Sequence, residues 1–325
     1  MANYKVLIIK IGALGDAVMA SFMIQTVRSI YPEAHITWLC GQEIFDLVKS
    51  FKGIDIVLSV DNKLLAGGFF SKIRFVLKCL KTLLGRKFDL CVTGNSDFRY
   101  RILSVSAICK IRRHFGGRFG PLPGRYHGIE YARLILGHDH SVETHYSPAE
   151  IDVTPSEASK NMVLLLPGGA RNIMRESNHR RWPLEKYREL AEALISHGIP
   201  VGIIGNEADL WVEEGFKGLN IKSFIGKADI QTLLSLIAGA RALVAHDSGP
   251  VHIAYLLKTP AVVLYGPTMP ESFLPYKLHQ SAISKKLPCS PCYDGRNYAD
   301  CKNNICMNSI NTDEVLKKLE EMSLI

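Results

Sequence analysis

The sequence lacks the long apolar segments of a membrane-spanning or secreted chain. No apolar run approaches the roughly 18–20 residues that a transmembrane helix needs. The N-terminus carries a run of four apolar residues before Lys10, which is too short for the apolar core of a signal peptide. We therefore expect a cytoplasmic protein in which this first run is a buried β-strand.

Acidic residues are scarce in the first half of the chain. Residues 1–150 hold 20 lysines and arginines against 12 acidic residues, whereas residues 151–325 hold 19 of each, so the first half accounts for the net charge of +8. Residues 98–129 include no acidic residue, and the glycines and prolines in their second half predict a loop. This asymmetry favours an acidic partner, with nucleic acid, an anionic membrane surface and an acidic small substrate as candidates.

The GxGxxG fingerprint of dinucleotide binding is absent after the first predicted strand, residues 5–11. This absence argues against an NAD-dependent oxidoreductase. The turn that follows, residues 12–16, has two glycines and ends in Asp16. Asp16 either caps the next helix or presents a carboxylate at the carboxyl edge of a parallel sheet, where open α/β sheets bind ligands.

A second strand–turn–helix unit lies at residues 242–257. A short apolar strand ends in the polar turn His246 to Gly249, and Pro250 suits the first turn of a helix. Two interpretations stay open for Asp247 and Ser248, since they either cap the helix or bind an anion at its N-terminus.

The length of 325 residues predicts two domains of about 150 residues each. Strand and helix patterns alternate in both halves, so we expect two Rossmann-like, doubly wound α/β domains that face each other across a cleft. The weakly patterned stretch at 146–161 predicts a linker, giving domains of residues 1–155 and 156–325. We expect the last helix, about 312–323, to pack back on the N-terminal domain.

Residues 69–84 form a basic amphipathic pattern at helical spacing. Its apolar residues are Phe69, Phe70, Ile73, Val76, Leu77, Leu80, Leu83 and Leu84. We favour a helix that packs this apolar side on the core and turns its lysines and arginines to solvent. Contact with an anionic membrane surface is the second interpretation.

Five segments together resemble glycosyltransferase family 9, the ADP-heptose:lipopolysaccharide heptosyltransferases. They are IGALGDAVMA at 11–20, PGGA at 167–170, RRWP at 180–183, IGKADIQTLLSLIAGARALVAHDSGPVHIA at 225–254 and YGPT at 265–268. The resemblance implies the GT-B architecture, with the acceptor on the N-terminal domain and the nucleotide sugar on the C-terminal domain. It also implies an inverting transfer that needs no metal for its chemistry.

The resemblance assigns a role to each candidate residue. Asp16 is the expected catalytic base, and the basic residues Arg99, Arg118 and Arg125 are the expected acceptor contacts. The expected donor contacts are Gly168, Gly169, Arg180 (with Arg181 as the alternative), Glu207, Asp247, Ser248, Gly249 and His252.

The implied function is transfer of heptose from ADP-heptose to an acidic glycolipid such as the lipopolysaccharide core. We expect a cytoplasmic monomer that binds no nucleic acid and contacts the inner membrane peripherally. The loop at 170–179 is longer than in the better-known heptosyltransferases, Arg180 stands where lysine is common, and Met269 stands where aspartate is usual. The alternatives are therefore a GT-B transferase or epimerase with another nucleotide sugar, and a non-catalytic binder of anionic glycolipids.

Four cysteines lie close together in the sequence: Cys289, Cys292, Cys301 and Cys306. Four thiolates at this spacing are candidate ligands of a structural zinc ion. A cytoplasmic setting argues against disulfides, and we favour packed free thiols over zinc.

Overall fold

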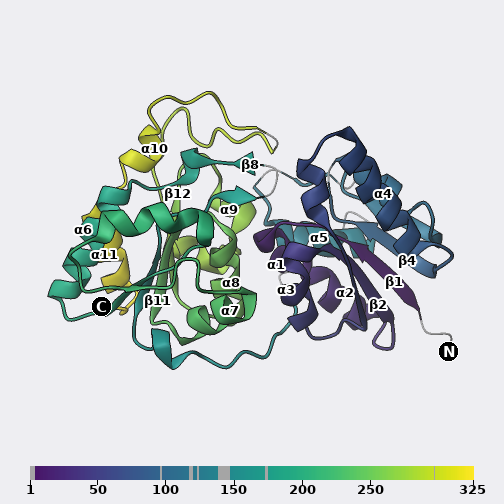
Figure 1. Ribbon diagram of the computed structural model, residues 1–325, viewed down its shortest axis with the longest axis horizontal. Coiled ribbons are helices and arrows are strands. Elements are labelled where there is room, and N and C mark those ends of the chain that lie inside the picture. The colour runs from purple at the N-terminus through teal and green to yellow at the C-terminus, as the bar shows by residue number, and fades with distance from the viewer. Residues whose placement is uncertain are drawn as a thin grey trace. The chain divides into compact units, whose positions relative to one another are not determined.

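The chain forms two compact units, the first ending at Asp152 and the second beginning at Val153. The computed structural model describes residues 4–95, 97–116, 120–122, 124–137, 147–172, 175–295 and 297–325. Each unit is built on a parallel β-sheet with helices on its faces (Figure 1). Two doubly wound α/β domains are thus confirmed, and the sequence-predicted boundary lies slightly after the structural one.

The first unit has a five-stranded sheet in the order β3-β2-β1-β4-β5. Every described pairing in it is parallel. Its strands are β1 (Lys5–Ile9), β2 (His35–Gly41), β3 (Ile56–Val60), β4 (Lys87–Thr93) and β5 (Ile108–His114). The central strand β1 is apolar from Val6 to Ile9 because both of its faces are buried.

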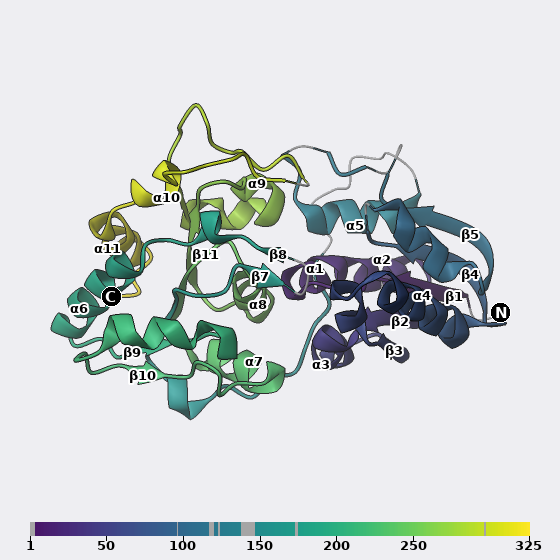
Figure 2. The ribbon, with the colours of Figure 1, turned by 45° about the horizontal axis from the view of Figure 1, so that its top comes forward.

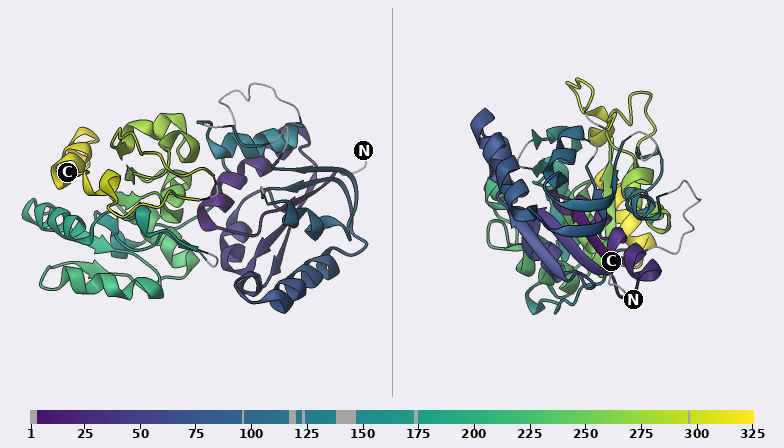
Figure 3. Two further views of the ribbon diagram at one scale, coloured as in Figure 1. Left: turned by 90° about the horizontal axis from the view of Figure 1, so that it is seen from above. Right: turned by 90° about the vertical axis from the view of Figure 1, so that its right-hand side faces the viewer.

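Helices cover both faces of this sheet (Figure 3). The α-helices are α1 (Leu14–Ala20), α2 (Phe22–Ile30), α3 (Phe45–Ser50), α4 (Phe69–Leu83) and α5 (His127–Leu136), and the 3₁₀ helices are η1 (Gln42–Ile44), η2 (Asn62–Ala66) and η3 (Phe98–Ser104). Leu7 and Ile9 belong to the core under α4. Helices α1, α2 and α5 pack on one another.

Helix α4 meets this core through a narrow stripe. Phe75, Cys79 and Leu83 are buried, whereas Phe70 is 84% exposed and Leu77 is 59% exposed. The prediction that the apolar side of this helix packs on the core is therefore wrong for most of that side. No helix among the described residues is long and apolar enough to cross a membrane.

The second unit has a six-stranded sheet in the order β10-β9-β6-β11-β12-β13. Its described pairings are again parallel. The strands are β6 (Val163–Leu166), β9 (Val201–Ile203), β10 (Lys222–Ser223), β11 (Ala242–His246), β12 (Ala261–Tyr265) and β13 (Ala282–Ser284). A separate two-stranded sheet joins β7 (Arg171–Asn172) and β8 (Arg175–Glu176).

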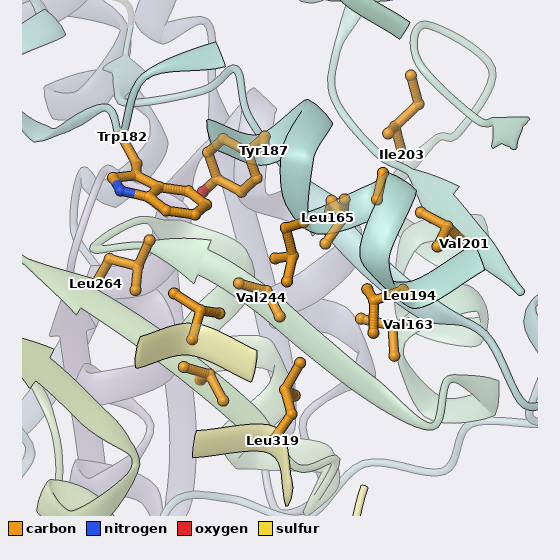
Figure 4. Packing of buried hydrophobic residues seen from close by; sticks show 14 of the residues in the cluster. Val163, Leu165, Trp182, Tyr187, Leu194, Val201, Ile203, Val244, Leu264 and Leu319 are labelled. Atoms are coloured by element: carbon orange, nitrogen blue, oxygen red, sulfur yellow. The ribbon is translucent and has the colours of Figure 1, made fainter. Parts of the chain in front are cut away.

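The helices of this unit bury one continuous apolar cluster, in which Tyr187 and Leu194 meet the strand residues Leu165 and Val244 (Figure 4). The helices are η5 (Glu157–Ser159), η6 (Asn178–Arg180), α6 (Leu184–Ser196), η7 (Glu207–Phe216), α7 (Ile230–Gly239), α8 (Gly249–Leu257), α9 (Pro270–Phe273), η8 (Tyr276–Ser281), α10 (Ile305–Asn308) and α11 (Thr312–Glu321).

The last helix, α11, belongs to the second unit. It lies beside α6 and contacts β12 (Figure 2). Its inward residues, Val315 and Leu319, are fully buried in the cluster of that unit. The apolar stripe of α11 packs on α6 and the sheet of this unit, and the expected contact of the last helix with the N-terminal domain stays a prediction.

Candidate active site

Both sheets place polar turns at the point where their strand order reverses. This point lies between β1 and β4 in the first unit and between β6 and β11 in the second. Loops at the carboxyl ends of such strands form the usual ligand crevice of open α/β sheets. The predicted residues Asp16, Gly168 and Asp247 all follow these strands, so topology alone puts them at the two expected ligand sites.

Asp16 is held by a buried lysine. The Lys10 Nζ donates to the Asp16 Oδ2 at 2.8 Å. The Lys10 side chain is 5% exposed and that of Asp16 is 39% exposed. Asp16 lies in the first turn of α1, whose N-cap residue is Ala13. Asp16 is therefore not the N-cap, and it presents a carboxylate that is partly open to solvent.

Lys10 is the residue of this site that the sequence analysis missed. Its Nζ also lies 5.6 Å from the centre of the Tyr131 ring, and the Tyr131 hydroxyl donates to the Gly94 carbonyl at 3.3 Å. Burial alone would lower the pKa of Lys10, but Asp16 and Tyr131 outweigh it and raise that pKa. The lysine therefore stays charged beside Asp16. Its only signal in the sequence is a charge at the end of an apolar strand.

The turn after β11 is organised around Asp247. The Thr268 Oγ1 donates to the Asp247 Oδ2 at 2.8 Å, which ties this turn to the one after β12. The Arg180 Nη1 donates to the Asp247 carbonyl at 3.1 Å and lies 3.6 Å from its Oδ2. The Arg180 Nε is buried without a hydrogen-bond partner among the described residues. A cation thus lies directly against the turn.

Ser248 is the N-cap residue of α8, but its side chain does not cap the helix. Its Oγ donates to the His246 carbonyl at 2.8 Å instead. The Ser248 side chain therefore does not satisfy the amide groups at this helix start, and the interpretation of Ser248 as a capping residue is wrong. Pro250 has no N–H and the Val251 amide donates to the Ser248 carbonyl at 3.2 Å, so this helix start offers an anion the Gly249 amide and the helix dipole. Gly249 is the first residue of α8, and His252 is buried in its first turns.

His246 lies beneath the turn as a neutral group. Burial, together with Arg180 and Arg181, lowers its pKa to about 3. The Tyr187 hydroxyl lies 3.4 Å from its Nδ1. A neutral histidine here leaves Arg180 and Arg181 as the cations of this region.

Asp209, which the sequence analysis also missed, joins the turns after β6 and β9. Its Oδ1 accepts from the Gly169 amide at 2.9 Å and its Oδ2 from the Asn206 amide at 3.0 Å. A Cβ at Gly168 would lie 2.5 Å from the Asp209 side chain, so only glycine fits there. Glu207, the expected ribose contact, is exposed at the start of η7 beside this cluster.

The two neighbouring arginines have different roles. Arg181 donates to the Gly169 carbonyl at 2.7 Å and pairs with Glu176 at 2.7 Å. It therefore braces the loop after β6, whereas Arg180 lies on the Asp247 turn. Of the two candidate phosphate contacts, Arg180 is thus the one that lies at the Asp247 turn, and Arg181 is engaged elsewhere.

Part of the basic zone of residues 98–129 is paired with acidic residues just outside it. Arg99 bonds Asp97, with its Nε 2.9 Å from the Asp97 Oδ2. The Nε of Arg125 lies 3.3 Å from Oε1 of the fully buried Glu130. These paired arginines are therefore less available to bind an external anion than the sequence predicts. Arg118, the third expected acceptor contact, lies outside the described residues.

The four clustered cysteines are near one another but do not form a recognisable metal site. Burial raises the pKa of the Cys306 thiol, and Cys292, Cys301 and Cys289 raise it further. The described part of the chain has no group of three or more His, Cys, Asp or Glu arranged to hold a metal ion. The cysteines as placed do not fit zinc, and all four are free thiols.

This pair of doubly wound units is the GT-B architecture. The family model of glycosyltransferase family 9 (heptosyltransferase) matches residues 137–302. That match covers half of the sequence, and the chain belongs to this family.

Known relatives cover most of the chain. Lipopolysaccharide heptosyltransferase 3 of Escherichia coli is 27% identical over 289 residues, which are 78% of this chain and 80% of the relative. The solved E. coli ADP-heptose lipopolysaccharide heptosyltransferase II superposes with a TM-score of 0.74 at 20% identity, covering 98% of each chain. A solved E. coli heptosyltransferase with ADP-2-deoxy-2-fluoro heptose gives a TM-score of 0.66 at 14% identity, covering 98% of this chain and 99% of that one.

Proposed function

We propose that this glycosyltransferase moves heptose from ADP-heptose to an acidic glycolipid of the lipopolysaccharide core. The observation that carries the proposal is the buried turn at the start of α8, where Arg180 lies against Asp247 and the Ser248 side chain does not cap the helix. A cation and a helix N-terminus together suit a diphosphate. The relatives' names supply heptose as the sugar and lipopolysaccharide as the acceptor class.

In the proposed reaction, the Asp16 carboxylate removes the proton of the acceptor hydroxyl. The acceptor oxygen attacks the anomeric carbon from the face opposite the diphosphate, and the bond between that carbon and the phosphate oxygen breaks. The electron pair of that bond leaves with ADP, so the anomeric configuration inverts. Arg180 and the N-terminus of α8 stabilise the charge that develops on the leaving diphosphate. The proposal needs no metal, since these groups supply the positive charge.

Donor contacts are proposed for the residues around this turn. Asp247, Ser248, Gly249 and His252 lie at the diphosphate and sugar, Gly168 and Gly169 let the backbone approach, and Glu207 contacts the ribose. On the acceptor side we propose Arg99, because its surface pair with Asp97 contributes little and can be exchanged for an acceptor anion. Acceptor contacts by Arg118 and Arg125 remain predictions. For Arg125, the buried Glu130 carboxylate competes with the acceptor.

A transfer assay with a panel of nucleotide sugars tests the proposal. We expect turnover with ADP-heptose and a lipopolysaccharide-core acceptor, and little with UDP- or GDP-sugars. Asp16→Asn should lower turnover by about 10²–10⁴-fold, the contribution of a positioned general base. Turnover with a UDP-sugar in place of ADP-heptose would instead support a GT-B enzyme with another donor. Near-normal turnover of Asp16→Asn would refute the assignment of the base.

A further inference from the structure

The outer side of α4 carries an apolar stripe that the core does not use. The exposed fractions are 72% for Phe69, 84% for Phe70, 40% for Ile73 and 59% for Leu77. At 100° per residue these positions share one side of the helix, well away from the side on which Phe75, Cys79 and Leu83 face the core. Large aromatic and aliphatic side chains exposed together mark an interaction surface.

This stripe continues beyond the end of α4. Leu84 is 72% exposed, and the adjacent Gly85 amide donates to the Ser106 carbonyl at 3.2 Å. The Ile108 amide donates to the Arg86 carbonyl at 2.8 Å, and Ile108 is 57% exposed. The exposed apolar residues therefore extend from α4 to Leu84, and the chain there is hydrogen-bonded to the start of β5.

The charge around the stripe has one sign. Residues 62–88 contain seven lysines and arginines and no acidic residue: Lys63, Lys72, Arg74, Lys78, Lys81, Arg86 and Lys87. Arg74 and Lys81 lie next to the apolar stripe on the helical wheel, and both are exposed. The contacts among described residues include no ion pair for any of the seven, unlike Arg99 or Lys110 further along the chain. Their charge remains available to an external anion.

We propose that α4 and the following residue, Leu84, dock on an anionic phospholipid bilayer. The side chains that enter the bilayer interface are Phe69, Phe70, Ile73, Leu77 and Leu84. An amphipathic helix that lies in a bilayer interface combines aromatic and aliphatic residues with lysines and arginines of this kind. A protein groove would explain the apolar residues alone, whereas the uniformly positive margin matches the negative surface of a bilayer. The inference goes beyond sugar transfer, because docking requires neither donor nor acceptor.

Co-sedimentation of the full chain with vesicles tests this surface without any transfer assay. We expect binding to phosphatidylcholine vesicles that contain phosphatidylglycerol, weaker binding to phosphatidylcholine alone, and loss of binding as salt screens the charges. The triple variant F69S/F70S/L77S should lower vesicle affinity at least about tenfold, since it removes three inserting side chains. K72Q/R74Q/K81Q should also lower it, by about fivefold for each charge that lies near the lipid.

The matched control is Y276S/I305S. It removes two exposed apolar residues of the second unit, Tyr276 at 85% and Ile305 at 52% exposure, and should leave vesicle binding unchanged. Thermal unfolding of every variant should match the parent chain, because the substituted residues are exposed. Equal vesicle binding by F69S/F70S/L77S and the parent chain would overturn the proposal. So would a shift of F69S/F70S/L77S from dimer to monomer in light scattering with vesicle binding unchanged, which would make the surface a contact between copies.

Discussion

At the scale of single residues, the candidate site depends on pairs of unlike residues that the fold brings together. Lys10 ends an apolar strand and would be expected in solvent, yet it is buried against Asp16 and Tyr131. A buried cation is stable only with a partner. The same pairing orients the Asp16 carboxylate, so Lys10 is a positioning residue for the proposed base.

Replacing Lys10 by methionine tests this role. Turnover should fall by at least about tenfold, and the acidic limb of the pH–rate profile should move by about one pH unit or more to higher pH, because removal of the cation favours the protonated carboxyl group. Lys10→Arg, which keeps the charge, should retain more turnover. An unchanged pH–rate profile in Lys10→Met would show that the lysine serves stability alone.

His246 makes stability depend on pH. Because burial and the two neighbouring arginines lower its pKa to about 3, it stays neutral in the folded chain while the unfolded chain takes up a proton below about pH 6.5. The free energy of unfolding should therefore fall by up to about 1.4 kcal/mol per pH unit as pH drops below 6.5 and continue to fall towards pH 3.

We expect His246→Asn to reduce the loss of thermal stability between pH 7 and pH 5 relative to the parent chain. Asparagine can still meet the Tyr187 hydroxyl but does not titrate. His197→Asn, at an exposed histidine, is the control and should leave the loss unchanged. Identical pH dependence in His246→Asn and the parent would contradict the neutral, buried state of His246.

At the scale of elements, two helices show where periodicity stops being informative. Both α4 and α11 are amphipathic, and the sequence analysis predicted an apolar side for α4 and a packing partner for α11. For α4 the core takes the stripe of Phe75, Cys79 and Leu83 and leaves the larger one in solvent. For α11 the buried stripe of Val315 and Leu319 packs within the second unit, beside α6. Periodicity identifies an apolar side and does not say what covers it.

Leu319→Ala measures how far α11 supports the second unit. Leu319 is fully buried in the apolar cluster, and truncation of such a leucine costs about 2–5 kcal/mol of unfolding free energy. Denaturant unfolding of the variant should therefore have a lower midpoint. The affected transition should be that of the second unit, which is the one that added ADP is expected to stabilise. The exposed Lys317→Ala on the same helix should change stability by no more than about 0.5 kcal/mol.

At the scale of the whole molecule, the proposed base and the proposed donor turn belong to different units. Substitutions in one unit should therefore separate binding of the nucleotide from chemistry.

ADP-induced thermal stabilisation makes this separation measurable. A ligand at 100 times its Kd stabilises the folded chain by about 2.7 kcal/mol. Asp16→Asn should keep the full ADP shift while turnover is lost. Arg180→Ala should reduce the shift, because a charge-assisted contact with phosphate contributes about 1.5–3 kcal/mol. Equal shifts in Arg180→Ala and the parent would remove Arg180 from the donor site.

Apart from the edge strands β5, β10 and β13, the sequence alone was enough to predict the two α/β units, the strands of their main sheets and the polar turns that carry Asp16 and Asp247. These follow from apolar runs, glycines and helix-start residues that are adjacent in the chain, where local patterns are read directly. The tertiary structure decided the rest: Lys10 beside Asp16, Asp209 between two turns, Arg180 apart from Arg181, and the exposed stripe of α4. Burial, pairing and exposure of these side chains are set only when the elements pack together, and even Lys10 and Asp16, six residues apart, meet only because the chain turns back after β1.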